Sequence, residues 1–124
     1  MAMTAPDLAI PRVELAPAAA LFRSLGDPAR LAILRQLAGG PARVVDLVAA
    51  LGLAQSTVSK HLACLRDCGL VDSQPQGRAS LFRLAQPAVM EILAAAEPVL
   101  AATGNAVALC PTYGIDACAD EDPS

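Results

Sequence analysis

The sequence predicts a mainly α-helical domain that carries one small β-hairpin. Alanine supplies much of the 55% apolar content and aromatic residues make up only 2% of the chain, a composition that favours helices over a β-sandwich. Apolar residues recur at helical spacing in several segments that end at glycine, as helices do. Two short runs typical of strands flank a turn that contains Pro75 and Gly77, which predicts the hairpin.

The chain of 124 residues has the length of one domain, because a second core would leave both cores small. We expect a flexible N-terminal arm over residues 1–16, one folded domain over residues 17–103, and a tail over residues 104–124. No basic and apolar leader begins the chain, and charge, Pro or Gly interrupts every apolar stretch before the roughly 18 residues that span a bilayer. These features predict a cytoplasmic protein without a membrane partner.

The helices have recognisable ends. The first begins near Pro17, and Asp27 and Pro28 form an N-cap and first helical position for the second, which runs to Gly39. A further helix over residues 43–51 closes at Gly52, and the next, over residues 55–68, stops at Gly69. Two short helices joined by a tight turn that contains glycine predict a helix-turn-helix.

A β-hairpin is expected after the second helix of this motif. Residues 70–73 and 80–84 have the composition of short strands, and residues 74–79 between them favour a turn. A hairpin in this position is the wing of a winged helix-turn-helix.

The last predicted helix starts at Pro87 and carries a long apolar stripe, which Pro98 is expected to kink or shorten. The stripe is too long for a domain of this size to cover alone, so we expect it to pack against a second copy of the chain with help from the helix of Leu21 and Phe22. The predicted assembly is a symmetric homodimer. The stripe consists of Val89, Ile92, Leu93, Ala96, Val99 and Leu100.

The helix over residues 55–68 has the pattern of a DNA-reading helix. Its core stripe is formed by Val58, Leu62 and Leu65, at 100° per residue. The opposite side presents short hydrogen-bonding groups and one cation, which suit the major groove. We expect Arg78, at the hairpin tip, to reach a phosphate or the minor groove. The residues on the exposed side are Gln55, Ser56, Ser59 and Lys60.

The charge distribution agrees with a nucleic-acid partner although the net charge of −3 does not. Between Arg23 and Arg83 the chain carries eight basic and four acidic residues, an excess of four positive charges. The other acidic residues lie in the flanks of the chain, mostly in the last helix and the tail. The central segment is therefore basic in an acidic protein.

Three segments in order resemble the ArsR/SmtB family of metal-responsive repressors. They are residues 25–34 (LGDPARLAIL), 55–62 (QSTVSKHL) and 65–71 (LRDCGLV), followed by Gly77 and Arg78 in the hairpin. The resemblance covers about residues 18–100 and implies a homodimer that binds inverted-repeat operator DNA and leaves it when its inducer binds. By position, it assigns DNA contacts to Gln55, Ser56, Ser59 and Lys60.

The four cysteines are expected to be reduced thiols in the cytoplasm, available to metals. Cys64 and Cys68 are spaced i and i+4, which places them on one face of the DNA-reading helix. They need a third donor, for which Cys110 beyond the last helix is available. The set resembles the cadmium- and lead-sensing CmtR-type branch of the family, in which a tail thiolate joins two helix thiolates. Cys118 has no counterpart there.

Three thiolates without imidazole or carboxylate favour soft ions, here Cd²⁺ or Pb²⁺ as inducer, and arsenite also accepts three sulfurs. No organic cofactor is expected. Pulling Cys64 and Cys68 toward Cys110, of the same or the partner subunit, would distort the helix that carries Ser59 and Lys60. The sequence thus predicts a repressor that is released by metal.

Two alternatives use the same cysteines. A thiol redox or persulfide sensor of the same fold is one, although an i,i+4 pair on a continuous helix gives strained disulfide geometry. The other is an enzyme with a cysteine nucleophile, for which Cys64 near His61 is the one candidate pair. No oxyanion loop or third orienting residue accompanies that pair in the sequence, so we expect no enzymatic activity.

Overall fold

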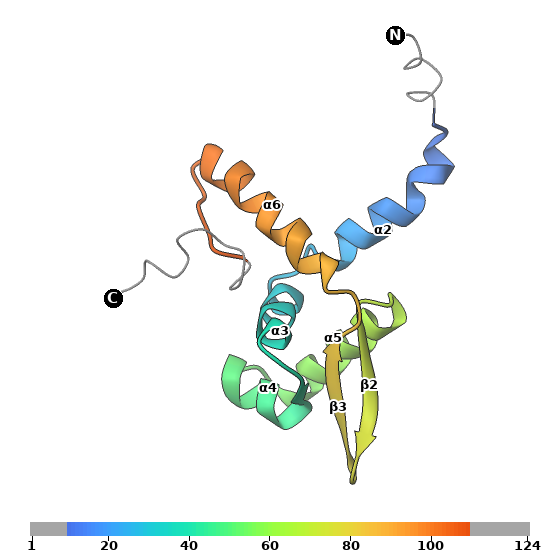
Figure 1. Ribbon diagram of the computed structural model, residues 1–124, viewed down its shortest axis with the longest axis vertical. Helices are drawn as coiled ribbons and strands as arrows, with labels where there is room; N and C mark the ends of the chain where they lie inside the picture. Colours follow the sequence, from blue (N-terminus) through green and yellow to red (C-terminus); the bar gives the residue numbers. More distant parts are fainter. Residues whose placement is uncertain (1–9, 110–124) are drawn as a thin grey trace.

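The computed structural model describes residues 10–109 and has the predicted mainly helical architecture with a small antiparallel sheet (Figure 1). The body of the domain consists of three helices and the sheet, and two further helices extend from it. The elements in chain order are η1 (Arg12–Leu15), α2 (Ala16–Ser24), α3 (Pro28–Ala38), β1 (Ala42–Arg43), α4 (Val44–Leu51), α5 (Gln55–Asp67), β2 (Val71–Gln76), β3 (Ala79–Leu84) and α6 (Ala88–Ala102).

The helix-turn-helix is formed by α4 and α5. Gly52 ends α4 with φ of 70°, a left-handed conformation that permits the short connection over residues 52–54. The Asp27 carboxylate caps α3 by accepting hydrogen bonds from the backbone N–H groups of Ala29 and Arg30, as the sequence predicted. Asp27 thus fixes where α3 begins, and Gly52 fixes where α4 ends.

The wing is longer than predicted, and it has an additional strand beside it. The strand order is β1-β3-β2, all antiparallel, and β2 pairs with β3 from Val71 opposite Leu84 to Gln76 opposite Ala79. The turn therefore contains only Gly77 and Arg78 rather than the predicted six residues. Pro75 is tolerated within β2 because this is an edge strand, where a missing N–H need not break the ladder.

The core lies between α3, α4, α5, the sheet and the start of α6. Val58, Leu62 and Leu65 are at most 1% exposed and form the buried face of α5, which confirms the predicted stripe. They join a single cluster with Ile33 and Leu34 of α3. Burial on this side of α5 leaves its opposite side to solvent.

Two helices, α2 and α6, project from the body at the end opposite the tip of the wing (Figure 1). One side of the first half of α6 is buried within the chain, since Val89 and Leu93 belong to the core, so only part of the predicted apolar stripe is open. Beyond it, Val99 of α6 is 64% exposed and Phe22 of α2 is 59% exposed. Pro98 does not end the helix.

Within residues 10–109, no helix is both long enough and apolar enough to cross a membrane.

Candidate functional site

The predicted DNA-reading side of α5 is open to solvent. Gln55, Ser56, Ser59 and Lys60 are all exposed. The N-cap of α5 is Ala54, which offers no side-chain cap, and in the described part of the chain neither serine hydroxyl has a hydrogen-bonding partner. The first two turns of α5 thus present hydroxyl, amide and ammonium groups that are not engaged in the fold.

The wing adds one cation at its tip. Arg78 is exposed beside Gly77, whose φ of 65° permits the tight turn. Two other arginines of the sheet are paired with acidic side chains: Arg83 Nε lies 3.0 Å from Asp72 Oδ1, and Arg43 Nε lies 3.3 Å from Asp46 Oδ2.

The ion pair between Arg43 and Asp46, at the start of α4, is close enough to shift the pKa of both groups. The hydrogen bond with Asp46 raises the pKa of Arg43, and the Arg43 side chain and backbone N–H lower the pKa of Asp46. Lys60 and Arg78 form no ion pair among residues 10–109, so their charges are available to a polyanion.

The two cysteines of α5 lie one turn apart. Cys64 is half-buried, whereas Cys68 is the exposed C-cap residue, whose backbone N–H donates to the Cys64 carbonyl at 3.1 Å. Both are free thiols, so the helix offers two soft donors on one side. The predicted third donor, Cys110, and Cys118 lie outside the described residues, and residues 10–109 alone contain no group of three metal-ligating side chains.

The chain that precedes Cys110 runs back along α6 (Figure 1). The Leu109 N–H donates to Glu97 Oε2 of α6 at 2.7 Å, and the Leu109 side chain packs against the core cluster. The start of the tail is therefore held on α6 of its own chain.

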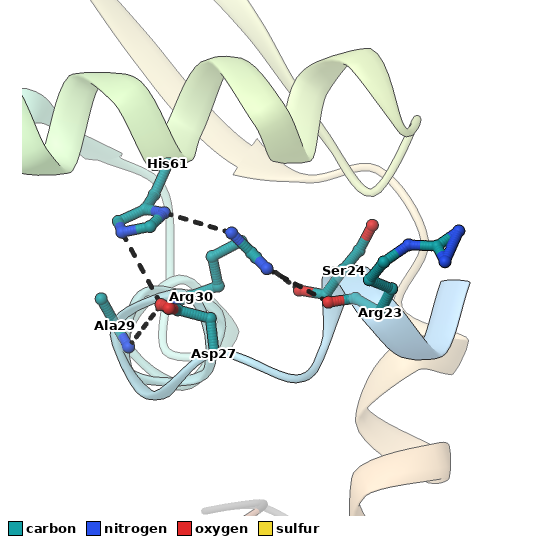
Figure 2. A network of polar contacts seen from close by, with 6 residues as sticks. All are labelled: Arg23, Ser24, Asp27, Ala29, Arg30 and His61. Atoms are coloured by element: carbon teal, nitrogen blue, oxygen red, sulfur yellow. Dashed lines mark hydrogen bonds and ion pairs between the residues drawn. The ribbon is translucent and has the colours of Figure 1, made fainter. Parts of the chain in front are cut away.

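His61 contacts α3 rather than serving as an open ligand (Figure 2). Its Nε2 lies 3.6 Å from Asp27 Oδ2 and its Nδ1 lies 3.4 Å from Arg30 Nη1. The backbone N–H of Arg30, the charge of His61 and the N–H of Ala29 hold the pKa of Asp27 below its usual range. These contacts give His61 a structural role between α5 and α3.

Sequence reasoning missed two residues that join α2 to α5. Arg30 donates from Nε to the Ser24 carbonyl at 2.6 Å and from Nη2 to the Arg23 carbonyl at 3.1 Å (Figure 2). The Ser24 hydroxyl lies 3.0 Å from Cys68 Sγ. A serine between an arginine and a leucine gives no sequence signal for such a contact, because the partner is 44 positions away.

The chain has clear relatives among bacterial regulators. Residues 27–73 match the family described as bacterial regulatory protein, arsR family. The chain is 33% identical over 92 residues to a probable mercury resistance operon repressor of Streptomyces lividans, which covers 74% of each chain. It is 48% identical over 67 residues to the HTH-type transcriptional regulator CmtR of Mycobacterium tuberculosis, a match to 54% of this chain and 57% of that relative.

The solved structures agree with the fold. A homodimeric winged helix-turn-helix DNA-binding domain of Mycobacterium bovis has a TM-score of 0.64 and 29% identity, over 73% of this chain and 83% of that one. The relatives are transcriptional regulators, so the cysteine-nucleophile alternative is discarded. The fold, the exposed side of α5 and the matched segments together show that this chain belongs to the ArsR family of bacterial regulatory proteins.

Proposed function

We propose that the chain is a repressor that binds inverted-repeat operator DNA as a homodimer and is released when Cys64, Cys68 and Cys110 bind Cd²⁺ or Pb²⁺. The observation that carries the proposal is the position of two free thiols on the same helix as the exposed DNA-reading side. Ligand binding and DNA reading then depend on the conformation of one element, α5.

DNA binding is assigned to the exposed groups of α5 and to the wing tip. Ser59 and Lys60 suit base edges and phosphates in the major groove, and Arg78 suits a phosphate or the minor groove. Gln55 and Ser56 complete the set at the start of α5. A homodimer would place two copies of α5 on two half-sites of the operator.

The thiols suit a soft metal ion. Cys64 and Cys68 are one turn apart and chemically free, and a third thiolate from Cys110 would exclude hard ions by ligand type. A soft ion, when bound, would hold the sulfur atoms of Cys64, Cys68 and Cys110 together. The resemblance to the cadmium- and lead-sensing CmtR-type branch is the reason for naming Cd²⁺ or Pb²⁺; arsenite shares the ligand preference, and the similarity to a probable mercury resistance operon repressor agrees with a soft ion.

Release from operator DNA is explained by the position of the two thiols at the C-terminal end of α5. Drawing Cys64 and Cys68 toward a tail thiolate would twist or fray the helix that presents Ser59 and Lys60. Coupling of this kind typically changes the affinity for DNA by about 5- to 150-fold.

Single cysteine variants test the ligand set. Cys64→Ser, Cys68→Ser and Cys110→Ser should each lose most of the Cd²⁺-induced release of operator DNA, because a hydroxyl is a hard and weak ligand. Cys118→Ser is the matched control and should respond nearly as the unchanged protein does. Full Cd²⁺-induced release of operator DNA by Cys110→Ser protein would show that Cys110 is not a ligand.

Mixing two variants tests where Cys110 binds. If the thiolate comes from the partner subunit, Cys110→Ser protein mixed with Cys64→Ser/Cys68→Ser protein should regain one complete site in each heterodimer. If all three thiolates come from one chain, the mixture should remain unresponsive. The readout is Cd²⁺-induced release of a fluorescent operator fragment.

A further inference from the structure

The end of α2 is tied to α5 at two places. At the first, Ser24 Oγ lies 3.0 Å from Cys68 Sγ. At the second, Arg30 holds the Ser24 carbonyl through Nε and faces His61 Nδ1 through Nη1 (Figure 2). Since α2 is one of the two helices that project from the body, both contacts join a projecting helix to the DNA-reading helix.

Ser24 is the one buried polar side chain among the described residues, with 6% of its surface exposed. A buried hydroxyl without a partner destabilises a fold. Within residues 10–109 the hydrogen-bonding partner of this hydroxyl is the Cys68 sulfur. The fold therefore favours the arrangement in which Cys68 stays against the end of α2.

We propose that Ser24 is a positioning residue of the sensor: its hydroxyl holds Cys68 against α2 in the DNA-binding state, and metal capture of Cys68 breaks this contact. The inference rests on the proposed function and extends it, because it names the contact through which a ligand at Cys68 would reach the DNA-reading helix. On binding, the thiol proton leaves to solvent and a sulfur lone pair goes to the metal ion.

Metal binding would change both the protonation and the position of the Cys68 sulfur. A thiol can donate a hydrogen bond to the Ser24 hydroxyl or accept one from it. A metal-bound thiolate has no proton to donate, so the Ser24 hydroxyl could then only donate to it. The sulfur must also turn toward the other two proposed metal ligands, Cys64 and Cys110, and this turn breaks the contact with Ser24. Loss of the contact between Ser24 and Cys68 would free the last turn of α5 from α2. The contact between Arg30 and His61 would still hold the middle of α5.

Two substitutions of Cys68 test the contact in metal-free protein. Cys68→Ser and Cys68→Ala both lack the soft donor, but only Cys68→Ser keeps a hydrogen-bonding partner for Ser24. We expect Cys68→Ala to bind an operator fragment, recovered by selection with the unchanged protein, at least fivefold more weakly than Cys68→Ser. Equal affinity of the two variants for that fragment would overturn the proposal.

Ser24→Ala provides a second test that leaves every cysteine in place. Cd²⁺ should still saturate the thiolates of this variant, seen as ultraviolet thiolate-to-metal charge transfer, while the Cd²⁺-induced loss of operator affinity shrinks at least fivefold. Ser24→Thr keeps the hydroxyl and should restore most of the response. A full response by Ser24→Ala would contradict the role given to Ser24.

The two sets of results separate this inference from the proposed function. Absence of charge transfer and of DNA release in the unchanged protein would reject the metal sensor. The comparison of Cys68→Ala with Cys68→Ser uses no metal, so it would still decide whether the Ser24 contact supports DNA binding.

Discussion

Leu65 lies on the buried side of α5 and has no exposed surface. Leu65→Ala should lower the free energy of unfolding by about 2–5 kcal/mol, because the substitution removes buried methyl groups and leaves a cavity. Urea denaturation measures the change. The exposed neighbour Arg66 supplies the control, since Arg66→Ala should change stability by no more than about 0.5 kcal/mol. Equal losses in the two variants would contradict the assigned orientation of α5.

Asp27 is expected to make stability depend on pH. The Arg30 N–H, the His61 charge and the Ala29 N–H lower its pKa from 3.8, so the folded state binds this proton less readily than the unfolded state. The stabilisation is complete above pH 3.8 and is lost as pH falls through the lower folded-state pKa. The stability difference between the unchanged protein and Asp27→Asn should therefore shrink in acid; a difference constant down to pH 2 would contradict this.

At the scale of elements, α5 and the wing tip should each contribute to the salt dependence of DNA binding. Lys60→Ala and Arg78→Ala should each reduce the slope of log affinity against log salt by about 1, because each would remove one phosphate contact. Arg83→Ala is the control within the same hairpin, since Arg83 is paired with Asp72, and its slope should change least. Unchanged slopes for Lys60→Ala and Arg78→Ala would show that another surface meets DNA.

The helices could be predicted because their signals are local. Asp27 and Pro28 mark the start of α3, and Gly52 marks the end of α4. The two-residue strand β1 is too short to show a periodicity, and its existence depends on pairing with β3. The length of the wing was missed for a similar reason, because the edge position that tolerates Pro75 is a property of the sheet.

The candidate site was predictable to the extent that it lies on one helix. Helical spacing brings Cys64 and Cys68 to one side of α5 and Ser59 and Lys60 to the exposed side. The contact of Cys68 with Ser24 arises from packing between distant segments, so spacing could not reveal it. The same holds for His61, whose contacts lie on α3.

At the scale of the whole molecule, the exposed apolar residues of α2 and α6 predict a dimer. Val99→Glu should shift the protein toward monomer at micromolar concentration, because a charge would be placed in the apolar contact. Sedimentation velocity measures the assembly. Val45→Glu is the control, since Val45 of α4 is 59% exposed but belongs to the body formed by α3, α4, α5 and the sheet. A monomeric unchanged protein would contradict the dimer.

The most direct test of the account is a titration of the reduced protein, bound to its fluorescent operator fragment, with Cd²⁺, Pb²⁺, Zn²⁺ and arsenite in turn. We expect release by Cd²⁺ and Pb²⁺ at concentrations near that of the protein, with operator affinity lowered by about 5- to 150-fold. The Cys64→Ser/Cys68→Ser protein should remain bound under the same conditions. Full Cd²⁺-induced release of that double variant would contradict sensing by the cysteines of α5.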